Sequence, residues 1–136
     1  MKRKIFASIF ITSLLCIVAA VLLVISVFYS NYYQKMKQEV EDEAYYFKNS
    51  VETSGVDVLE NIFWPGNISS LGRVTLISEN GDVLFDSYTE ASSLENHLDR
   101  PEIQAALQNG QGEETRLSDT LQENTYYYAV RLADGT

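Results

Sequence analysis

Residues 5–28 read IFASIFITSLLCIVAAVLLVISVF, a run of 24 positions without a charged side chain. A helix rises about 1.5 Å per residue, so this stretch is long enough to cross a hydrocarbon core about 30 Å thick. It directly follows the basic cluster Lys2-Arg3-Lys4, and positive charge is retained on the cytoplasmic side of a membrane. The sequence therefore predicts a cytoplasmic tail at residues 1–4, a transmembrane helix at residues 5–30 and an extracytoplasmic remainder.

Two kinds of cleaved leader are alternative interpretations of this apolar segment. A signal peptide has an apolar stretch of about 7–15 residues before a small-x-small site, whereas Ala19-Ala20 is followed by five more apolar residues. A lipoprotein signal needs a small residue before its cysteine, and Leu15 precedes Cys16. Cys16 is the only cysteine, so no disulfide can form within the chain. The uncleaved anchor is the favoured interpretation.

The exterior part is strongly acidic. All 19 acidic residues follow the apolar stretch, together with seven of the ten basic ones, which gives a net charge of about −12. Such a charge disfavours binding to nucleic acid and to anionic lipid. About 106 residues remain outside the membrane, enough for one small domain with one core.

An amphipathic helix is expected directly after the anchor. Apolar residues recur there at helical spacing, as Met36, Val40, Ala44, Phe47 and Val51. This predicts a membrane-proximal signalling helix over residues 31–64, with a break near Gly55 and an end at Trp64-Pro65-Gly66-Asn67. The apolar stripe packs either on the sheet of the same domain or on a second copy, so a homodimer is expected.

The pattern then changes to the period of two that is typical of strands. Arg73–Ser78 and Val83–Ser87 are predicted strands, and Asn80-Gly81 between them predicts a tight hairpin turn. Further strands are predicted at Glu114–Leu117 and Thr125–Leu132.

A short helix is predicted after Arg100. Asp99 and Glu102 have the spacing of a capping box, Pro101 suits the first turn, and Gly110 suits the C-terminal cap. Its expected buried face consists of Ile103, Ala106 and Leu107.

The end of the sequence carries a further turn signal, Ala133-Asp134-Gly135-Thr136. A hairpin turn leads into a partner strand, so the domain at residues 65–136 is expected to be incomplete and the chain to be a fragment. The predicted fold class is α+β: a transmembrane helix continues into a long amphipathic helix, followed by an antiparallel sheet with a short helix, truncated at the last hairpin.

Four segments resemble the exterior sensor region of bacterial membrane histidine kinases, most closely the phosphate-regulon type of Gram-positive bacteria. They are Arg73–Ile77, Val83–Ser87, Glu95–Ile103 and Thr125–Leu132. The resemblance implies a PAS-like or Cache-like exterior domain between two membrane helices. It also implies a parent protein that autophosphorylates on histidine with ATP and Mg²⁺ and passes the phosphate to a response regulator. The phosphoacceptor histidine and the nucleotide site match nothing in these 136 residues.

No catalytic or metal-binding constellation is predicted, because one histidine and one cysteine cannot build a Cys-His pair or a two-histidine site. His97, followed by Asp99 and Pro101, only faintly matches a phosphoacceptor box, since the acidic residue is displaced by one position. No cofactor is expected in this segment.

Six residues are candidates for ligand binding or sensing. A histidine titrates near neutral pH and arginines hold anions, while tyrosines can line a small pocket. The candidates are Asn96, His97, Arg100, Arg116, Tyr127 and Arg131. A purely structural role is the alternative: Asp99 caps the helix, His97 bonds to loop backbone, Arg100 pairs with Asp86 or Glu102, and the tyrosines pack.

The expected function is extracytoplasmic sensing and transmembrane signal input for a two-component histidine kinase, by displacement of the membrane-proximal helix. Two alternatives remain open. One is the sensor region of a chemotaxis receptor or other non-kinase receptor, and the other is a membrane-anchored envelope scaffold.

Overall fold

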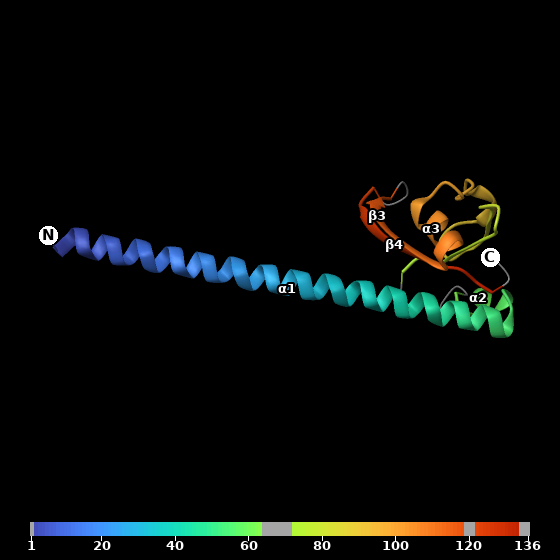
Figure 1. The fold of residues 1–136 in the computed structure, drawn as a ribbon, viewed down its shortest axis with the longest axis horizontal. Helices are drawn as coiled ribbons and strands as arrows, with labels where there is room; N and C mark the ends of the chain where they lie inside the picture. Colours follow the sequence, from blue (N-terminus) through green and yellow to red (C-terminus); the bar gives the residue numbers. More distant parts are fainter. Residues whose placement is uncertain (1, 64–71, 119–121, 134–136) are drawn as a thin grey trace. The chain divides into compact units, whose positions relative to one another are not determined.

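The computed structural model describes residues 2–63, 72–118 and 122–133, and its architecture is α+β as expected (Figure 1). The elements in chain order are α1 (Lys2–Ser54), α2 (Asp57–Ile62), β1 (Thr75–Ile77), β2 (Val83–Asp86), the 3-10 helix η1 (Ala91–Ser93), α3 (Pro101–Asn109), β3 (Gln111–Leu117) and β4 (Asn124–Val130). The predicted helix end at residues 64–67 and most of the predicted turn at residues 133–136 lie outside the described residues. The chain divides into two compact units, Met1–Gln38 and Glu39–Thr136, which are described separately.

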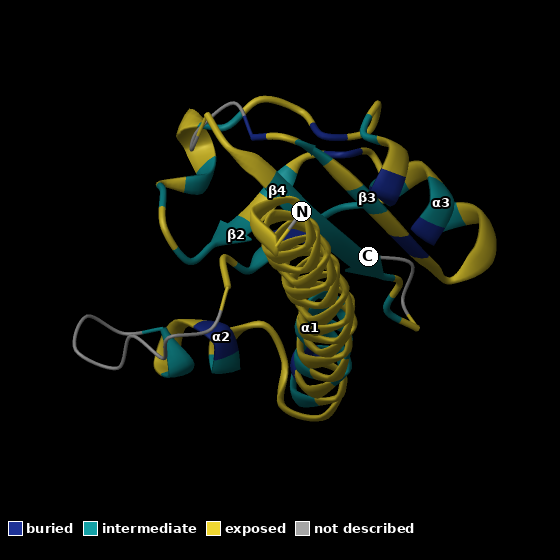
Figure 2. Cartoon of the chain, turned by 90° about the vertical axis from the view of Figure 1, so that its left-hand side faces the viewer, coloured by how far each residue is buried: buried dark blue, intermediate teal, exposed yellow. Residues whose placement is uncertain are grey.

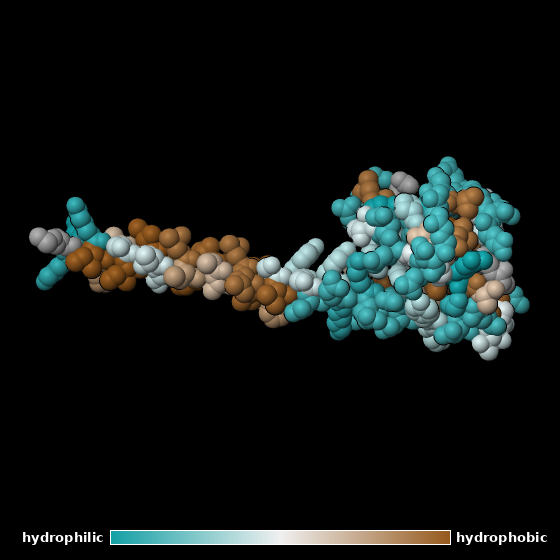
Figure 3. Space-filling view, viewed as in Figure 1, coloured by the Kyte–Doolittle hydropathy of each residue, from teal (hydrophilic) through white to brown (hydrophobic). Residues whose placement is uncertain are grey.

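The first unit is a single helical segment whose apolar side chains are exposed along its length (Figure 3). In the described part of the chain, α1 is the one helix long and apolar enough to cross a membrane. The Thr12 hydroxyl donates to the Ser8 carbonyl at 3.0 Å, so this polar side chain is hydrogen-bonded within the helix, as a lipid environment requires. Near the end of this unit the rings of Tyr29 and Tyr33 stack, with centroids 6.5 Å apart.

The second unit begins with the last turns of α1, and the predicted apolar stripe is confirmed there. Phe47 and Val51 are buried with Leu59 of α2 and Leu76 of β1 in one hydrophobic core. Gly55 ends α1 with φ of +82°, a conformation that glycine adopts without a steric penalty. α2 then turns Leu59, which is 1 % exposed, into the core (Figure 2).

The first hairpin and its tight turn are confirmed. β1 and β2 pair antiparallel, with Leu76 opposite Phe85. The Gly81 amide donates to the Ser78 carbonyl at 2.9 Å and the Ser78 amide to the Asp82 carbonyl at 2.8 Å. The predicted tight turn is present, but of Asn80 and Gly81 only Gly81 has a positive φ, +86°. The observed loop is a three-residue turn closed by one left-handed glycine, a common hairpin solution.

Helix α3 confirms the predicted Pro101 start and the Gly110 cap, which has φ of +88°. The predicted capping box is wrong, because Arg100 is the N-cap residue and makes no side-chain cap hydrogen bond. Glu102 is instead 3 % exposed and forms an ion pair with Arg116 of β3. The reason is close packing against β3: a Cβ at Gly112 would lie 2.2 Å from the Glu102 carbonyl oxygen, so the helix rests directly on that strand.

The second hairpin consists of β3 and β4, which pair antiparallel with Glu114 opposite Tyr127. β3 is longer than predicted because Gly110 leads straight from α3 into it. Helix α3 lies against one face of this hairpin (Figure 1). On the other face the ring of Tyr128 lies 6.4 Å from that of Tyr45 on α1. Both predicted faces of β4 are therefore packed, one against α3 and the other against α1.

Candidate functional site

A cavity of about 590 Å³ lies inside the second unit. Its walls come from α1, β1, β4, α3 and the loop before α3. Part of its apolar lining belongs to the core around Phe47 and Leu76. Five of the six candidate residues line it: His97, Arg100, Arg116, Tyr127 and Arg131. The cavity therefore combines an apolar floor with a group of cationic and aromatic side chains.

His97 is 3 % exposed, so it is a buried histidine. Its backbone amide donates to the Gly81 carbonyl at 2.8 Å, which attaches the loop before α3 to the first hairpin. Among the described residues, nothing hydrogen-bonds to the Nδ1 atom of its ring. Burial lowers the pKa of His97, and the positive charge of Arg100 lowers it further. His97 is therefore held in its neutral form at neutral pH.

Arg100 is half-buried beside other charges. Burial lowers its pKa, as does the positive charge of Arg116, while Glu102 and Tyr127 act in the opposite direction. The predicted pairing of Arg100 with Asp86 or Glu102 is wrong, because these carboxylates form ion pairs with Arg73 and Arg116.

The guanidinium of Arg100 accordingly has hydrogen-bond donors to offer. Among the described residues, no side chain forms a hydrogen bond or ion pair with it. A guanidinium presents five N–H donors and is charged at any physiological pH. A partly desolvated arginine in this state favours an anionic partner.

Arg116 is fixed in place by two contacts. Its Nη2 atom lies 2.9 Å from Oε1 of Glu102, and its guanidinium carbon lies 4.1 Å above the centre of the Tyr127 ring. The second contact is a cation–π interaction. Oε2 of Glu102 is buried and has no hydrogen-bond partner among the described residues. The ion pair thus leaves one carboxylate oxygen of Glu102 without a hydrogen bond from the described residues.

Asn96, which does not line the cavity, and Arg131, which does, both have structural contacts. The side-chain amide of Asn96 donates to the Asn80 carbonyl at 2.8 Å and to the Asp82 carboxylate at 2.9 Å, so Asn96 fixes the turn of the first hairpin. Arg131 donates from Nη1 to the Leu107 carbonyl at 3.1 Å, which ties the end of β4 to α3.

Sequence reasoning missed three charged residues that matter here. Glu102 was assigned to a cap, although its spacing of four from the buried Ala106 places both on one helix face. Arg73 pairs with Asp86, whose side chain is fully buried, at 2.7 Å. Glu43 lines the cavity from α1, and burial raises its pKa. No local pattern marks Arg73 or Glu43, because their partners, Asp86 and the backbone of Gly72, are distant in sequence.

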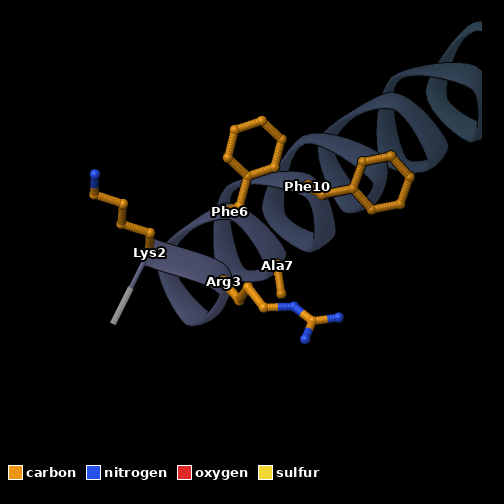
Figure 4. Close-up of a pocket in the computed structure, with 5 residues that line it drawn as sticks. All are labelled: Lys2, Arg3, Phe6, Ala7 and Phe10. Atoms are coloured by element: carbon orange, nitrogen blue, oxygen red, sulfur yellow. The ribbon is translucent and has the colours of Figure 1, made fainter.

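A second hollow, of about 470 Å³, lies at the start of α1. Figure 4 shows its lining side chains projecting from successive turns of one helix. They are Lys2, Arg3, Phe6, Ala7 and Phe10. A single helix cannot enclose a ligand, so we assign no binding site to this surface. In the described ranges no group of three histidine, cysteine or acidic residues is arranged to hold a metal ion.

Comparison with known families matches residues 30–136 to the family described as Single Cache-like. No curated protein and no solved structure matches the chain. Domains of this kind are typical of the extracellular sensor regions of bacterial histidine kinases and chemoreceptors. The match begins just after the apolar segment and includes every residue that lines the large cavity.

Proposed function

Because the chain belongs to the single Cache-like family, an extracellular sensing module of signal-transduction receptors, we propose that it is the input region of a transmembrane sensor histidine kinase that binds a small anion. The observation that carries the choice of ligand is the half-buried guanidinium of Arg100 at the cavity wall. The choice of a kinase is supported by the resemblance of the four segments between Arg73 and Leu132. The phosphate-regulon type remains a prediction based on that resemblance alone.

The charge balance around the cavity supports an anionic ligand. The positive charge of Arg116 is close enough to lower the pKa of Arg100, and the negative charge of Glu102 acts in the opposite direction. Two cations facing one carboxylate leave a positive local potential, in spite of the strongly acidic chain as a whole. An anion bound between them would restore neutrality in a region of low dielectric constant, where the gain is large.

Signal transfer would run through the packing of α1. Phe47 and Val51 of α1 share one core with Leu76 and Leu59. A ligand that draws α3 and β4 together would repack this core and displace α1, because packed cores switch between discrete arrangements. The output domain of the parent protein would read the displacement as a bias between two states.

The ligand is tested on the chain reconstituted in lipid nanodiscs. Isothermal titration calorimetry with acetate, succinate and inorganic phosphate is expected to show binding of at least one anion. Arg100→Gln should weaken that binding by about tenfold or more, the cost of one charge-assisted hydrogen bond. Lys35→Gln, which removes a positive charge outside the cavity, should leave it unchanged. Equal affinity of both variants, or no binding of any anion, would contradict the proposal.

The output is tested separately. Membranes containing the natural full-length protein are incubated with Mg²⁺ and labelled ATP, and a kinase is expected to acquire an acid-labile phosphohistidine. A chemotaxis receptor, the second candidate, would acquire none, and would instead alter the activity of a separate kinase. The anchored scaffold predicts neither result.

The proposed homodimer is tested by single cysteines placed from Met36 to Val51 in a protein with Cys16→Ser. Crosslinking at helical spacing is expected, with a pattern that changes when the output is switched. A pattern that is identical in both signalling states would rule out displacement of α1 as the mechanism.

A further inference from the structure

The residues that follow β4 are held to α1 by polar contacts at two points. The Lys48 side chain donates from Nζ to the Arg131 carbonyl. One turn further along the helix, Oε1 of Glu52 accepts a hydrogen bond from the Ala133 amide at 2.8 Å. Lys48 and Glu52 also form an ion pair with each other, in which Nζ and Oε1 lie 3.2 Å apart. Residues 131–133, which we call the strap, are thus fixed along one face of α1.

Between these two polar contacts the strap has an apolar one. Leu132 packs against the hydrophobic core that contains Phe47 and Val51 of α1. Apolar packing has no preferred direction, so by itself it would let the end of β4 slide or turn relative to the helix. Hydrogen bonds are directional. Two of them, one helical turn or about 5.4 Å apart, fix both the position of the strap along α1 and its rotation about the helix axis.

The strap is tied to α3 at its other end. The Arg131 amide donates to the Gly110 carbonyl at 2.9 Å, and Nη1 of Arg131 donates to the Leu107 carbonyl at 3.1 Å. Both acceptors belong to the C-terminal end of α3. No Cα atom of α1 lies within 8 Å of a Cα atom of α3, and both helices are described in full. The strap therefore connects two helices whose backbones are apart.

The strap also lies at the large cavity. Lys48, Arg131 and Leu132 all belong to the cavity lining, so a change in the cavity wall reaches the strap directly. The side chains of Lys48 and Glu52 are 22 % and 29 % exposed, and ion pairs at such exposure add little to stability. The two side chains therefore set a position more than they hold the fold together.

We propose that the strap is the coupling element that carries a change at the cavity to α1. This coupling rests on the function proposed above, because it needs a cavity whose state changes on binding. A shift of α3 moves Arg131 through its contacts with Gly110 and Leu107. The strap moves with Arg131, and Lys48 and Glu52 pass the displacement to α1. Both side chains are positioning residues, since they act through the strap.

Hydrogen exchange of the chain in nanodiscs tests the coupling without a ligand. Coupling between two sites is reciprocal, so a change made at α1 must be felt at α3. Glu52→Ala removes the acceptor of the Ala133 amide, and Glu52 lies outside the cavity lining. The Gly110 amide, which donates to the Ala106 carbonyl at 2.8 Å, is expected to exchange about threefold or more faster in this variant, because local opening sets its rate. The Gln104 amide, at the start of α3, is the internal reference.

Two further variants make the exchange result specific. Glu52→Gln keeps a side-chain oxygen that can accept from the Ala133 amide, and it should restore slow exchange at Gly110. Glu60→Ala removes an exposed acidic side chain from α2 and should leave exchange at Gly110 unchanged. Equal exchange at Gly110 in Glu52→Ala and Glu60→Ala would overturn the strap as a coupling element, whatever the cavity binds.

A distance measurement tests transfer from the cavity to α1. Spin labels are attached through Asn49→Cys on α1 and Gln108→Cys on α3, both exposed positions, in a chain that carries Cys16→Ser. Pulsed electron paramagnetic resonance then reports the separation of the two labels. The probe is inorganic phosphate, succinate or acetate, whichever binds by calorimetry, and it is expected to shift the separation by about 1 Å or more.

The strap and the ligand can fail separately in this measurement. Glu52→Ala should remove most of the shift while leaving the affinity for the probe unchanged, and Glu52→Gln should keep the shift. Binding without any shift in the unaltered chain, or an undiminished shift in Glu52→Ala, would overturn the proposal. If none of the three anions binds, the proposed ligand class alone is wrong, and the exchange experiment decides on the strap.

Discussion

Asp86 and Glu102 are both carboxylates buried against an arginine, yet their surroundings differ. Oδ2 of Asp86 lies 2.7 Å from Arg73 Nε and accepts from the Thr75 hydroxyl at 2.7 Å, and Oδ1 accepts from the amides of Tyr88 and Thr89. Glu102 has one ion pair with Arg116 and one oxygen without a partner among the described residues. The first region is a completed hydrogen-bond network and the second is not. Completed networks fix a fold, whereas incomplete ones leave room for a ligand.

The largest expected effect comes from breaking the completed network. Asp86→Ala removes four hydrogen bonds at a fully buried side chain and leaves Thr75 and two backbone amides unpaired. The free energy of unfolding should fall by about 3 kcal/mol, measured by urea denaturation. A loss below about 1 kcal/mol would show that Asp86 does not organise the first hairpin.

The turn of the same hairpin should be the next most sensitive place. Gly81 has φ of +86°, and a Cβ there would lie 2.3 Å from Oδ1 of Asn96 and 2.6 Å from the Leu98 amide nitrogen. Gly81→Ala is therefore expected to cost about 2 kcal/mol or more. Gly55→Ala is the matched control, because Gly55 also has a positive φ but has open space around its Cβ. Its cost should be about 1 kcal/mol, and equal losses would remove the role of the Asn96 clamp.

A smaller effect on stability, with a larger one on binding, is expected at Glu102. Glu102→Gln keeps the shape of the side chain but removes the charge that competes with an anion for Arg116. Stability should change by about 1 kcal/mol or less, while anion affinity measured by calorimetry should rise severalfold. An unchanged or weaker affinity would mean that the Glu102 region is as closed as that of Asp86.

The smallest effect is a dependence of stability on pH. Burial, followed by the charge of Arg100, lowers the pKa of His97, so the unfolded chain binds a proton that the folded chain does not. This stability is present above the unfolded pKa of about 6.5 and is lost as the pH falls through the lower folded pKa. Denaturation curves from pH 7.5 to 5 should show the loss, and His97→Gln should flatten it. An unchanged slope in the variant would assign the loss to other groups.

Asp86 should act at lower pH than His97. Burial raises its pKa, but hydrogen bonds from Arg73, Thr75 and the amides of Tyr88 and Thr89 outweigh it, and the net shift is downward. Its stabilisation is therefore present above about pH 4 and is lost as the pH falls further. The two groups are separable in one pH series.

Local patterns in the sequence predicted the elements better than the site. The apolar stripe through Phe47 and Val51, the Gly81 hairpin and the Pro101–Gly110 helix depend on periodicity and on residues with special backbone preferences. The predicted role of Glu102 was wrong because a glutamate at this position of a helix can belong either to a capping box or to a buried ion pair. The neighbouring sequence is the same in both cases. The choice between them depends on Gly112 and Arg116, which only the folded chain brings near.

The same limit explains the candidate residues. One cavity is lined by five of the candidates, His97, Arg100, Arg116, Tyr127 and Arg131. They were chosen because cations and aromatic rings suit a ligand, without any knowledge of where the fold places them. Asn96 was grouped with them by position, and its two hydrogen bonds to the turn at Asn80 and Asp82 could not be foreseen without the geometry of that turn.

His97 is the one histidine in the 136-residue chain, and it lies in the wall of the cavity. In a proton NMR spectrum of the untagged protein, signals from an imidazole ring can therefore come only from His97. The carbon-bound imidazole protons of a histidine resonate apart from most other signals, so a single pair of lines would report from inside the cavity. A ligand entering beside Arg100 would shift those lines without any label, and the molecule thus contains its own spectroscopic probe.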